Sequence, residues 1–365
     1  MPVAHHNISK ASAPLKCFQI NLRHSRCAAL NLSQLILDLD IDVILIQEPY
    51  AAMSPLSSSF EPKFVPLGYS SFHNLSSEHA FGALIIAKSS LNASLCIFGL
   101  SNNCCGIKLS NDLFCFSIYC RPSLVSIPLH LESIFNSIPP AVKKHAFFGI
   151  DCNAKSQAWN SVRTDHIGVD LELCFLNNAL SVSNVNLKLL SHKPSNTSFV
   201  DVTLAGDSVS LNGWQYPAYP SLSDHPFISF RVPFGCRVAL PARTEFRLPS
   251  PPNCNMPLFL SNLEASLGSM ASPSTVQTFT SPQDIEAFIA NLTDSIKSAA
   301  LKSKLPFHPS RAPARMPWWS DMMWSLRKKM KVAYKLSRES PSQGNRDAYS
   351  HLKAEYQRTL RAGKK

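Results

Sequence analysis

The stretch HAFFGIDCNAKSQAWNS, residues 145–161, combines a buried strand with polar residues that a strand does not need. Residues 146–150 are a short apolar run, which is the pattern of a fully buried strand. Asp151 and Asn153 follow at its carboxyl end, and residues two apart in an extended chain point to the same side. The stretch therefore predicts a carboxylate and an amide side by side at a strand tip. The alternative is an Asx turn capping the strand, because Asp and Asn are common turn residues.

Composition indicates a globular protein with a large core, since 45% of the 365 residues are hydrophobic. The 11 cysteines include no C-x-x-C pair and no zinc-type spacing, which favours unpaired thiols in a reducing compartment. Residues 1–16 lack the apolar core of a signal peptide, and no later apolar run reaches the ~18 to 20 residues of a membrane span. We therefore expect a soluble intracellular protein that is not secreted and has no membrane partner.

The net charge of +11 is concentrated near the end of the sequence. Residues 311–365 hold fourteen Lys and Arg against four Asp and Glu, so the preceding residues are close to neutral. A basic segment beside a near-neutral body suggests a polyanionic partner, and nucleic acid is the commonest one. The alternative is a solvated helical face.

Polar residues also end two earlier strands. A strand predicted at 16–21 ends in Asn21, and after a helical pattern at 27–39 a second strand at 42–48 ends in Glu48. A carboxylate directly behind an apolar run is costly to bury unless it is paired or bound to a cation. A surface carboxylate past the strand end is the alternative. The Ser- and Pro-rich residues 51–79 predict a long, functional loop.

Further strands are expected at 80–87, 94–99, 113–119 and 197–204, with helices at 130–138 and 168–179. Tyr119 ends one of these strands, and could either reach a ligand or be a rim residue. Asp201 interrupts an apolar series in mid-strand, whereas Asp224 and His225 directly precede a last strand. Strands with intervening helices favour two stacked sheets covered by helices.

The candidate site residues all lie at or next to a strand end, apart from the mid-strand Asp201: Asn21, Glu48, Tyr119, Asp151, Asn153, Asp201, Asp224 and His225. Oxygen ligands from Glu48 and neighbouring carboxylates suit a hard cation such as Mg²⁺, which neutralises charge on a phosphoryl group. His225, held by Asp201, would carry a proton or contact phosphate. Asp151 is suited to take a proton from an attacking water, and Asn153 to orient it.

Six segments carry a family resemblance: QIN (19–21), IQEPY (46–50), SIYCRP (117–122), GIDCNAKSQAW (149–159), SFVDVT (198–203) and SDH (223–225). They occur in the order found in the endonuclease/exonuclease/phosphatase superfamily. Within it the chain most resembles the apurinic-endonuclease-like domain of non-LTR retrotransposon polyproteins. Arg23 departs from the pattern of cellular apurinic endonucleases, which place an acid there, and this speaks against a preference for abasic sites.

The resemblance implies an α/β four-layer sandwich of two mixed β-sheets flanked by helices, as in deoxyribonuclease I. It also implies a Mg²⁺-dependent endonuclease, with Mn²⁺ as a substitute, that nicks DNA and leaves a 3′-hydroxyl to prime reverse transcription. Glu48 would be the metal ligand with Asn21 beside it, Asp151 the base and Asn153 its partner. The remaining roles are orientation of His225 by Asp201, and support of the phosphate or metal by Tyr119 and Asp224.

The resemblance also divides the chain, into a catalytic domain at 16–232, a Pro-rich linker at 233–252 and a helical basic extension at 253–365. A helix is expected at 282–299, and the PWW segment at 317–319 resembles the region that precedes the reverse transcriptase in such polyproteins. Apolar residues recur here at helical spacing, which predicts the packed face of a helix: Met322, Met323, Leu326, Met330 and Tyr334. The basic residues of the same segment are candidates for binding nucleic-acid phosphates: Arg327, Lys328, Lys329 and Lys331.

The expected partners are DNA and the RNA of such an element, and the expected place of action is the nucleus after synthesis in the cytoplasm. Two alternatives remain open. One is a non-catalytic remnant whose basic segment binds nucleic acid without turnover. The other is a phosphatase of the same fold that acts on another phosphoester, because fold alone does not separate these activities.

Overall fold

The computed structural model of the chain describes residues 13–54, 59–76, 81–109, 112–194, 198–234, 255–268, 281–303 and 314–363. The chain forms two compact units, one made of Met1–Arg237 with Pro313–Lys365 and the other of Val238–Ala312. The segment 253–365, expected as a single extension, is thus divided between the two units. The linker predicted at 233–252 lies outside the described residues, except for Pro233 and Phe234.

The first six-stranded sheet has the order β13-β14-β1-β2-β6-β5. Its strands are β1 (Leu15–Asn21), β2 (Val43–Gln47), β5 (Tyr69–His73), β6 (Ala83–Lys88), β13 (Asn212–Gln215) and β14 (Ile228–Val232). The sheet is mixed, because β1 and β2 run parallel while β14 and β6 pair with them antiparallel. The parallel register places Asn21 opposite Gln47, so both strands end at the same edge of the sheet.

The second six-stranded sheet has the order β11-β12-β10-β9-β8-β7. Its strands are β7 (Ser94–Ser101), β8 (Cys104–Lys108), β9 (Phe114–Tyr119), β10 (Ala146–Asp151), β11 (Leu180–Val182) and β12 (Asp201–Gly206). The parallel register of β9 and β10 places Tyr119 opposite Asp151, and the antiparallel register of β10 and β12 places Asp201 opposite Asp151. Three polar residues therefore meet across three neighbouring strands.

Two expectations about local structure were wrong. Asp201 begins β12 instead of interrupting it, because Phe199 takes a left-handed φ of 49° and the ladder starts only after that bend. The stretch 51–79 is not one long loop either, since its described part forms the ribbon β3 (Ala51–Met53) and β4 (Phe60–Pro62) and the edge strand β5. Aromatic residues attach this stretch to the body: Phe64 stacks on Tyr50 with ring centroids 5.6 Å apart.

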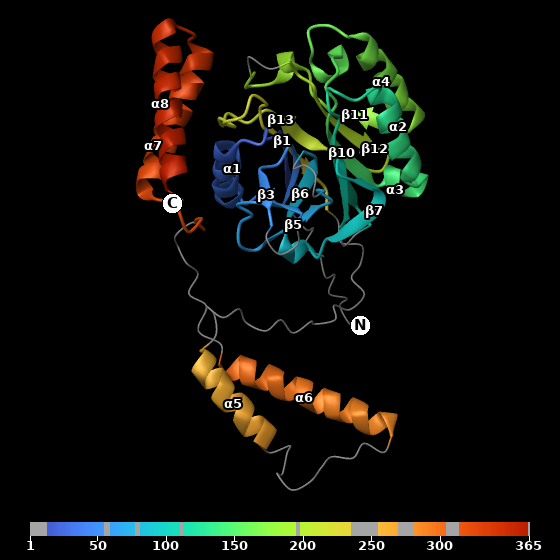
Figure 1. The fold of residues 1–365 in the computed structure, drawn as a ribbon, viewed down its shortest axis with the longest axis vertical. Helices are drawn as coiled ribbons and strands as arrows, with labels where there is room; N and C mark the ends of the chain where they lie inside the picture. The colour runs from blue at the N-terminus through green and yellow to red at the C-terminus, as the bar shows by residue number, and fades with distance from the viewer. Residues whose placement is uncertain are drawn as a thin grey trace, which may run out of the picture. The chain divides into compact units, whose positions relative to one another are not determined.

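The two sheets stack face to face, and helices cover both outer faces (Figure 1). An apolar layer lies between the sheets, where Phe147 of β10 meets Phe230 of β14 edge to face. Helix α1 (Arg26–Leu39) covers the first sheet, and α2 (Ile127–Ser137), α3 (Pro140–Lys144) and α4 (His166–Asn177) cover the second. The described cysteines are free thiols, and all but Cys174 are buried. The expected four-layer sandwich of mixed sheets is confirmed.

A helical hairpin adds a further layer outside α1 (Figure 1). It consists of α7 (Asp321–Glu339) and α8 (Gln343–Ala362), which belong to the same compact unit as the sheets. The hairpin covers the outer side of α1, so every residue from Cys27 to Ile36 is buried. The stripe predicted on α7 packs there, because Met323, Leu326, Met330 and Tyr334 are buried and only Met322 is exposed.

The second compact unit contains α5 (Met256–Gly268) and α6 (Pro282–Lys302) among its described residues. Helix α6 confirms the helix predicted at 282–299. It begins in a capping box, in which Ser281 and Asp284 each bond the other's backbone N–H. Asn262 of α5 donates a hydrogen bond to Ser303 at the end of α6. In neither unit does a described helix combine the length and apolarity needed to cross a membrane.

Candidate active site

The two parallel strand ends of the first sheet bring Asn21 and Glu48 to the predicted edge. Asn21 is buried and its Nδ2 donates to Asp151 Oδ2 at 2.7 Å and to Glu48 Oε1 at 3.3 Å. One amide therefore bridges a carboxylate from each sheet. This contact brings together the three residues that motif position assigned to the metal and to proton transfer.

Glu48 stands just beyond β2 in a left-handed conformation with φ of 45°, and its side chain is only 15% exposed. Tyr119 from the neighbouring sheet forms a hydrogen bond with Glu48. Burial, and after it this carboxylate, raise the pKa of Tyr119, so the phenol keeps its proton. On the other side, His24 Nε2 lies 3.3 Å from Glu48 Oε2. Glu48 is thus surrounded by polar groups and is not a free surface carboxylate.

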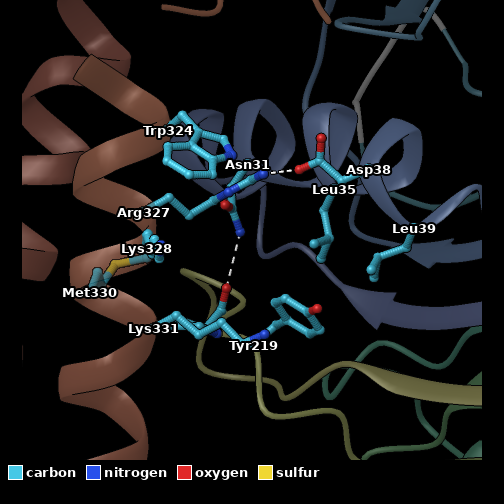
Figure 2. A pocket seen from close by; sticks show the side chains of 11 residues that line it. Asn31, Leu35, Asp38, Leu39, Tyr219, Trp324, Arg327, Lys328, Met330 and Lys331 are labelled. Carbon is cyan, nitrogen blue, oxygen red and sulfur yellow. Dashed lines mark hydrogen bonds and ion pairs between the residues drawn. The ribbon is translucent and has the colours of Figure 1, made fainter. Parts of the chain in front are cut away.

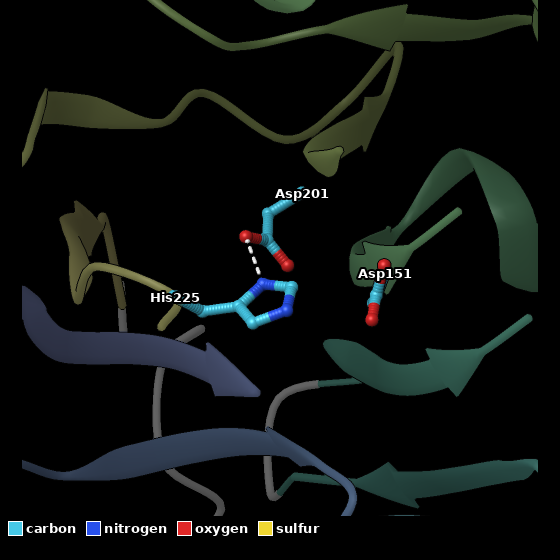
Figure 3. A group of neighbouring side chains, drawn as sticks. All are labelled: Asp151, Asp201 and His225. Carbon is cyan, nitrogen blue, oxygen red and sulfur yellow. Dashed lines mark hydrogen bonds and ion pairs between the residues drawn. The ribbon is translucent and has the colours of Figure 1, made fainter. Parts of the chain in front are cut away.

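Asp151, Asp201 and His225 form a cluster whose ligand atoms all lie within 4.8 Å of one another (Figure 3). His225 Nδ1 hydrogen-bonds Asp201 Oδ2 at 2.8 Å, so the expected pairing of these two residues is present. Burial and the neighbouring Asp201 raise the pKa of Asp151 to about 7, although His225 and Asn21 partly offset this. Asp151 can therefore exchange a proton near neutral pH.

The histidine of this cluster favours its charged form. Burial by itself lowers the pKa of His225, but the attraction and hydrogen bond of Asp201 outweigh it and raise the pKa to about 10. The second ring nitrogen faces the side on which Asp151 lies (Figure 3). Asp201 Oδ1 is buried and accepts no hydrogen bond from the described residues. The cluster is consequently polarised and has an unused oxygen acceptor.

Asn153 and Asp224, the other two candidates, occupy the borders of the site. The Asx turn considered from sequence is present, since Asp151 Oδ1 accepts the Asn153 backbone N–H at 3.2 Å. The Asn153 side chain donates to Cys120 O at 2.8 Å. Asp224 is exposed and pairs with Arg23 at 2.7 Å. The residue that departs from the cellular pattern therefore neutralises a carboxylate at the rim.

Sequence reasoning missed a buried polar network beneath the site. Gln47 Nε2 donates to Ser117 Oγ at 2.9 Å and to Gly149 O at 3.0 Å, which ties the first sheet to the second. Gln19 repeats this link with Thr203, whose hydroxyl donates to it at 2.9 Å. The glutamines of QIN and IQEPY were the available signal, because a long amide inside an apolar strand needs partners.

Gly149 explains how the two sheets approach so closely below the site. A Cβ at this position would lie 2.8 Å from Leu45 Cδ1 and 3.0 Å from the side-chain amide carbon of Gln19. A larger residue would push β10 away from the first sheet, and Asp151 ends that strand two residues later.

The basic residues predicted to bind nucleic acid lie on α7, and two of them face the body of the domain (Figure 2). Arg327 forms an ion pair with Asp38 of α1 and lies over the Trp319 ring at 4.5 Å. Lys331 Nζ lies 3.8 Å above the Tyr219 ring. Lys328 and Lys329 are exposed, with Lys328 over Trp324. Arg327 and Lys331 border a cavity of about 440 Å³ between α1 and α7.

The donor set at the strand ends suits a divalent cation. Glu48 and Asp151 direct carboxylate oxygens to the same Asn21 amide, and Asp201 adds an unused buried oxygen. Hard oxygen donors of this kind are those that Mg²⁺ prefers. Nearby positive charge would also relieve the repulsion between the two buried aspartates. The residues present therefore fit such an ion.

Comparisons with known proteins agree with this geometry. Residues 113–229 match a family model described as endonuclease-reverse transcriptase. Among solved structures, the endonuclease domain of TRAS1, a telomere-specific non-LTR retrotransposon, superposes with a TM-score of 0.50 at 22% identity, covering 60% of this chain and 98% of that one. Residues 113–229 therefore resemble an endonuclease-reverse transcriptase family, and the fold of the chain is similar to that of the TRAS1 domain. The resemblance expected from the six segments is thus confirmed.

Two further solved structures are similar to this chain. The Xenopus laevis APE2 catalytic domain has 14% identity and a TM-score of 0.45, covering 60% of this chain and 92% of that one. An endonuclease/exonuclease/phosphatase family protein from Leptotrichia buccalis C-1013-b has 13% identity and a TM-score of 0.39, covering 60% of this chain and 100% of that one. No curated protein matches the sequence.

Proposed function

We propose that this chain is a divalent-cation-dependent endonuclease that hydrolyses a phosphodiester of DNA and leaves a 3′-hydroxyl. The observation that supports it best is the meeting of Asn21 and Glu48 from one sheet with Asp151 and the Asp201–His225 pair from the other. Buried carboxylates with a charged histidine suit hydrolysis of a phosphate ester, where negative charge builds up on phosphoryl oxygens.

Asp151 acts as the general base in this proposal. With its pKa raised to about 7, the carboxylate is available near neutral pH and basic enough to take a proton from the attacking water. The oxygen of that water forms a bond to phosphorus while the bond from phosphorus to the 3′ oxygen breaks, and the leaving 3′ oxygen takes a proton from solvent water to become the 3′-hydroxyl. Asn21 fixes the Asp151 carboxylate through its hydrogen bond, and the Asn153 backbone N–H holds the other oxygen.

His225 acts on the phosphate. Its raised pKa keeps the ring protonated at neutral pH, and Asp201 fixes Nδ1, so Nε2–H is left to donate to a phosphoryl oxygen. A preorganised charged donor stabilises the negative charge of the transition state more than that of the ground state. Glu48, with Asn21 beside it, would hold Mg²⁺ or Mn²⁺, which when bound neutralises phosphate charge and orients the reaction.

The proposed setting is a retroelement in which the 3′-hydroxyl primes reverse transcription. It is supported by the family model that joins endonuclease and reverse transcriptase, and by the basic residues after 310. DNA is then the substrate, the RNA of the element a second partner, and the nucleus the place of action after synthesis in the cytoplasm.

The test is nicking of supercoiled plasmid by the full chain with Mg²⁺, with Mn²⁺ and with EDTA. We expect metal-dependent nicks, and a rate about 10² to 10⁴ times lower in Asp151→Asn and His225→Gln. His351→Gln, an exposed histidine of α8, is the matched control and should keep the wild-type rate. Nicks that a DNA polymerase extends without prior phosphatase treatment would establish the 3′-hydroxyl.

Two results would replace the proposal. Folded protein that binds DNA but never nicks it would be a non-catalytic remnant. Release of phosphate from a small phosphomonoester without nicking would identify a phosphatase of the same fold.

A further inference from the structure

One side of α7 faces residues 216–227, the loop that joins β13 to β14 and carries His225. Arg327, Lys331, Tyr334 and Arg338 follow one another at spacings of three or four residues, which places them on one face of the helix. The ammonium group of Lys331 lies over the ring of Tyr219 in this loop. Arg338, further along, lies over the Tyr334 ring at 5.2 Å. The hairpin therefore places cations beside the residues that lead into the active site.

A cavity of about 280 Å³ opens between this loop and the hairpin. Asp224 and His225 line it from the loop, so it adjoins the catalytic cluster. The hairpin contributes four side chains to its wall: Tyr334, Arg338, Tyr349 and Lys353. Two of these are cations, one from each helix.

The two cations in the cavity wall lack an anionic partner among the described residues. Within the described part of the chain neither Arg338 nor Lys353 forms an ion pair, whereas Lys335 pairs with Glu339. Arg338 Nε is buried without a hydrogen bond from the described residues. A buried donor left unpaired costs free energy, which an anion in the cavity would recover.

The carboxylates near the cavity do not cancel this charge. Asp224 is paired with Arg23 at 2.7 Å, and Asp201 is paired with His225 at 2.8 Å. Each acid therefore has its own cation. The positive charge of Arg338 and Lys353 remains available to an anion that reaches the cavity.

We propose that Arg338 and Lys353 bind a backbone phosphate of the DNA strand, next to the phosphate at His225. This rests on the proposed function, because it takes the strand to lie across His225. A nucleic-acid strand carries a phosphate at every residue, so the neighbours of a phosphate at His225 come close to the walls of the same cavity. The helical hairpin is then part of the nuclease and not only a connection to a following domain.

The chemistry of the two side chains fits a phosphodiester. The guanidinium of Arg338 offers a planar fork of donors, and stacking on Tyr334 holds that plane in place before the ligand arrives. Lys353 adds a compact positive charge from the facing helix. A contact to a backbone phosphate strengthens binding without selecting a sequence.

The test measures binding of a labelled DNA duplex to the full chain in EDTA, so that no cleavage occurs. Arg338→Gln with Lys353→Gln should weaken binding about tenfold at low salt and lower the slope of log affinity against log salt by roughly two. Lys335→Gln with Arg358→Gln is the matched control. This variant removes the same number of positive charges from the same two helices, but at exposed positions, and should leave the slope of log affinity against log salt unchanged.

The outcomes separate this inference from the proposed function. Equal losses of DNA affinity in both double variants, or no loss in either, would overturn the phosphate site even if the wild type nicks plasmid. Loss of binding to single-stranded RNA with DNA binding intact would also overturn it. A selective loss of DNA binding by a chain that never nicks would support the phosphate site and refute the endonuclease. If urea midpoints show the double variant to be unfolded, Lys353→Gln alone should lower the slope by about one.

Discussion

Helices α1 and α4 cover opposite sides of the sandwich, yet only α1 is buried on its outer face. Helix α4 buries only Gly168, Leu171 and Phe175, and leaves Leu176 73% exposed. Every residue of α1 from Cys27 to Ile36 is buried, because the α7–α8 hairpin lies over it. The domain is therefore asymmetric: one outer layer faces solvent, and the other is sealed by a segment distant in sequence.

The polar residues of α1 show what this covering does. Tyr356 of α8 donates a hydrogen bond to Asn31 Oδ1 at 3.0 Å, and Asn31 Nδ2 donates to Pro220 O at 3.0 Å. Pro220 lies in the loop that carries His225. A chain of hydrogen bonds thus runs from the hairpin through α1 to the loop that carries His225. No comparable layer covers α4 among the described residues, so the two sides should respond differently to substitution.

The largest difference is expected from Tyr356→Ala compared with Leu176→Ala. Tyr356 is fully buried, and its loss should leave a cavity and an unpaired Asn31, lowering the free energy of unfolding by about 3–5 kcal/mol. Leu176 on α4 is exposed, and its truncation should stay within about 0.5 kcal/mol. Urea unfolding followed by tryptophan fluorescence measures both. Similar midpoints for the two variants would show that the hairpin is not part of the folded core.

The next effect concerns the ion pair that joins hairpin to helix. Arg327 and Asp38 have side chains 13% and 22% exposed, and Arg327 also lies over Trp319. Arg327→Met should cost about 1–3 kcal/mol, less than the ~3–5 of a fully buried pair that loses one partner. Lys335→Gln breaks the exposed pair with Glu339 and should cost less than about 0.5 kcal/mol. Raising the salt concentration should weaken the exposed pair more than the covered one, and the reverse order would contradict this account.

The site and the hairpin also differ in how far the sequence predicts them. Asp151 and His225 could be predicted because each lies at the end or start of an apolar strand, where local pattern places a polar residue at a sheet edge. The start of β12 at Asp201 could not, because it depends on a left-handed Phe199, a conformation that local pattern assigns to Gly or Asn. The sheet-to-sheet bonds of Gln47 were hidden for a similar reason, since their partners lie in another strand.

The hairpin shows the same limit more strongly. The stripe on α7 predicts a buried face, but nothing in its spacing says that α1 is what covers it. Asn31 and Tyr356 lie 325 positions apart in the sequence. The basic residues chosen from their clustering include Arg327, which is used for packing, whereas Arg338 reaches the cavity at His225. Clustering of charge identifies the helix, but only the folded structure shows which face of α7 lies next to His225.

The smallest expected effect is a pH dependence confined to the hairpin side. His192 hydrogen-bonds the Tyr334 hydroxyl at 3.3 Å, and its pKa lies below the ordinary 6.5 because of burial and the nearby Arg338, with Glu339 opposing. Protonation therefore favours the unfolded chain. The contribution of His192 to stability is complete above the ordinary pKa, and is lost as pH falls through 6.5 towards the lowered value.

Urea midpoints of wild type and His192→Gln measure this difference. From about pH 7.5 to about pH 5.5 the wild type should lose more stability than the variant, while the exposed His351→Gln should follow the wild type. Arg338→Gln removes the nearby positive charge, so the pKa of His192 should rise and the acid loss should shrink. If neither His192→Gln nor Arg338→Gln changes the loss of stability at acid pH, protonation of His192 does not affect the stability of the hairpin. The asymmetry between the two outer layers would then be one of packing alone.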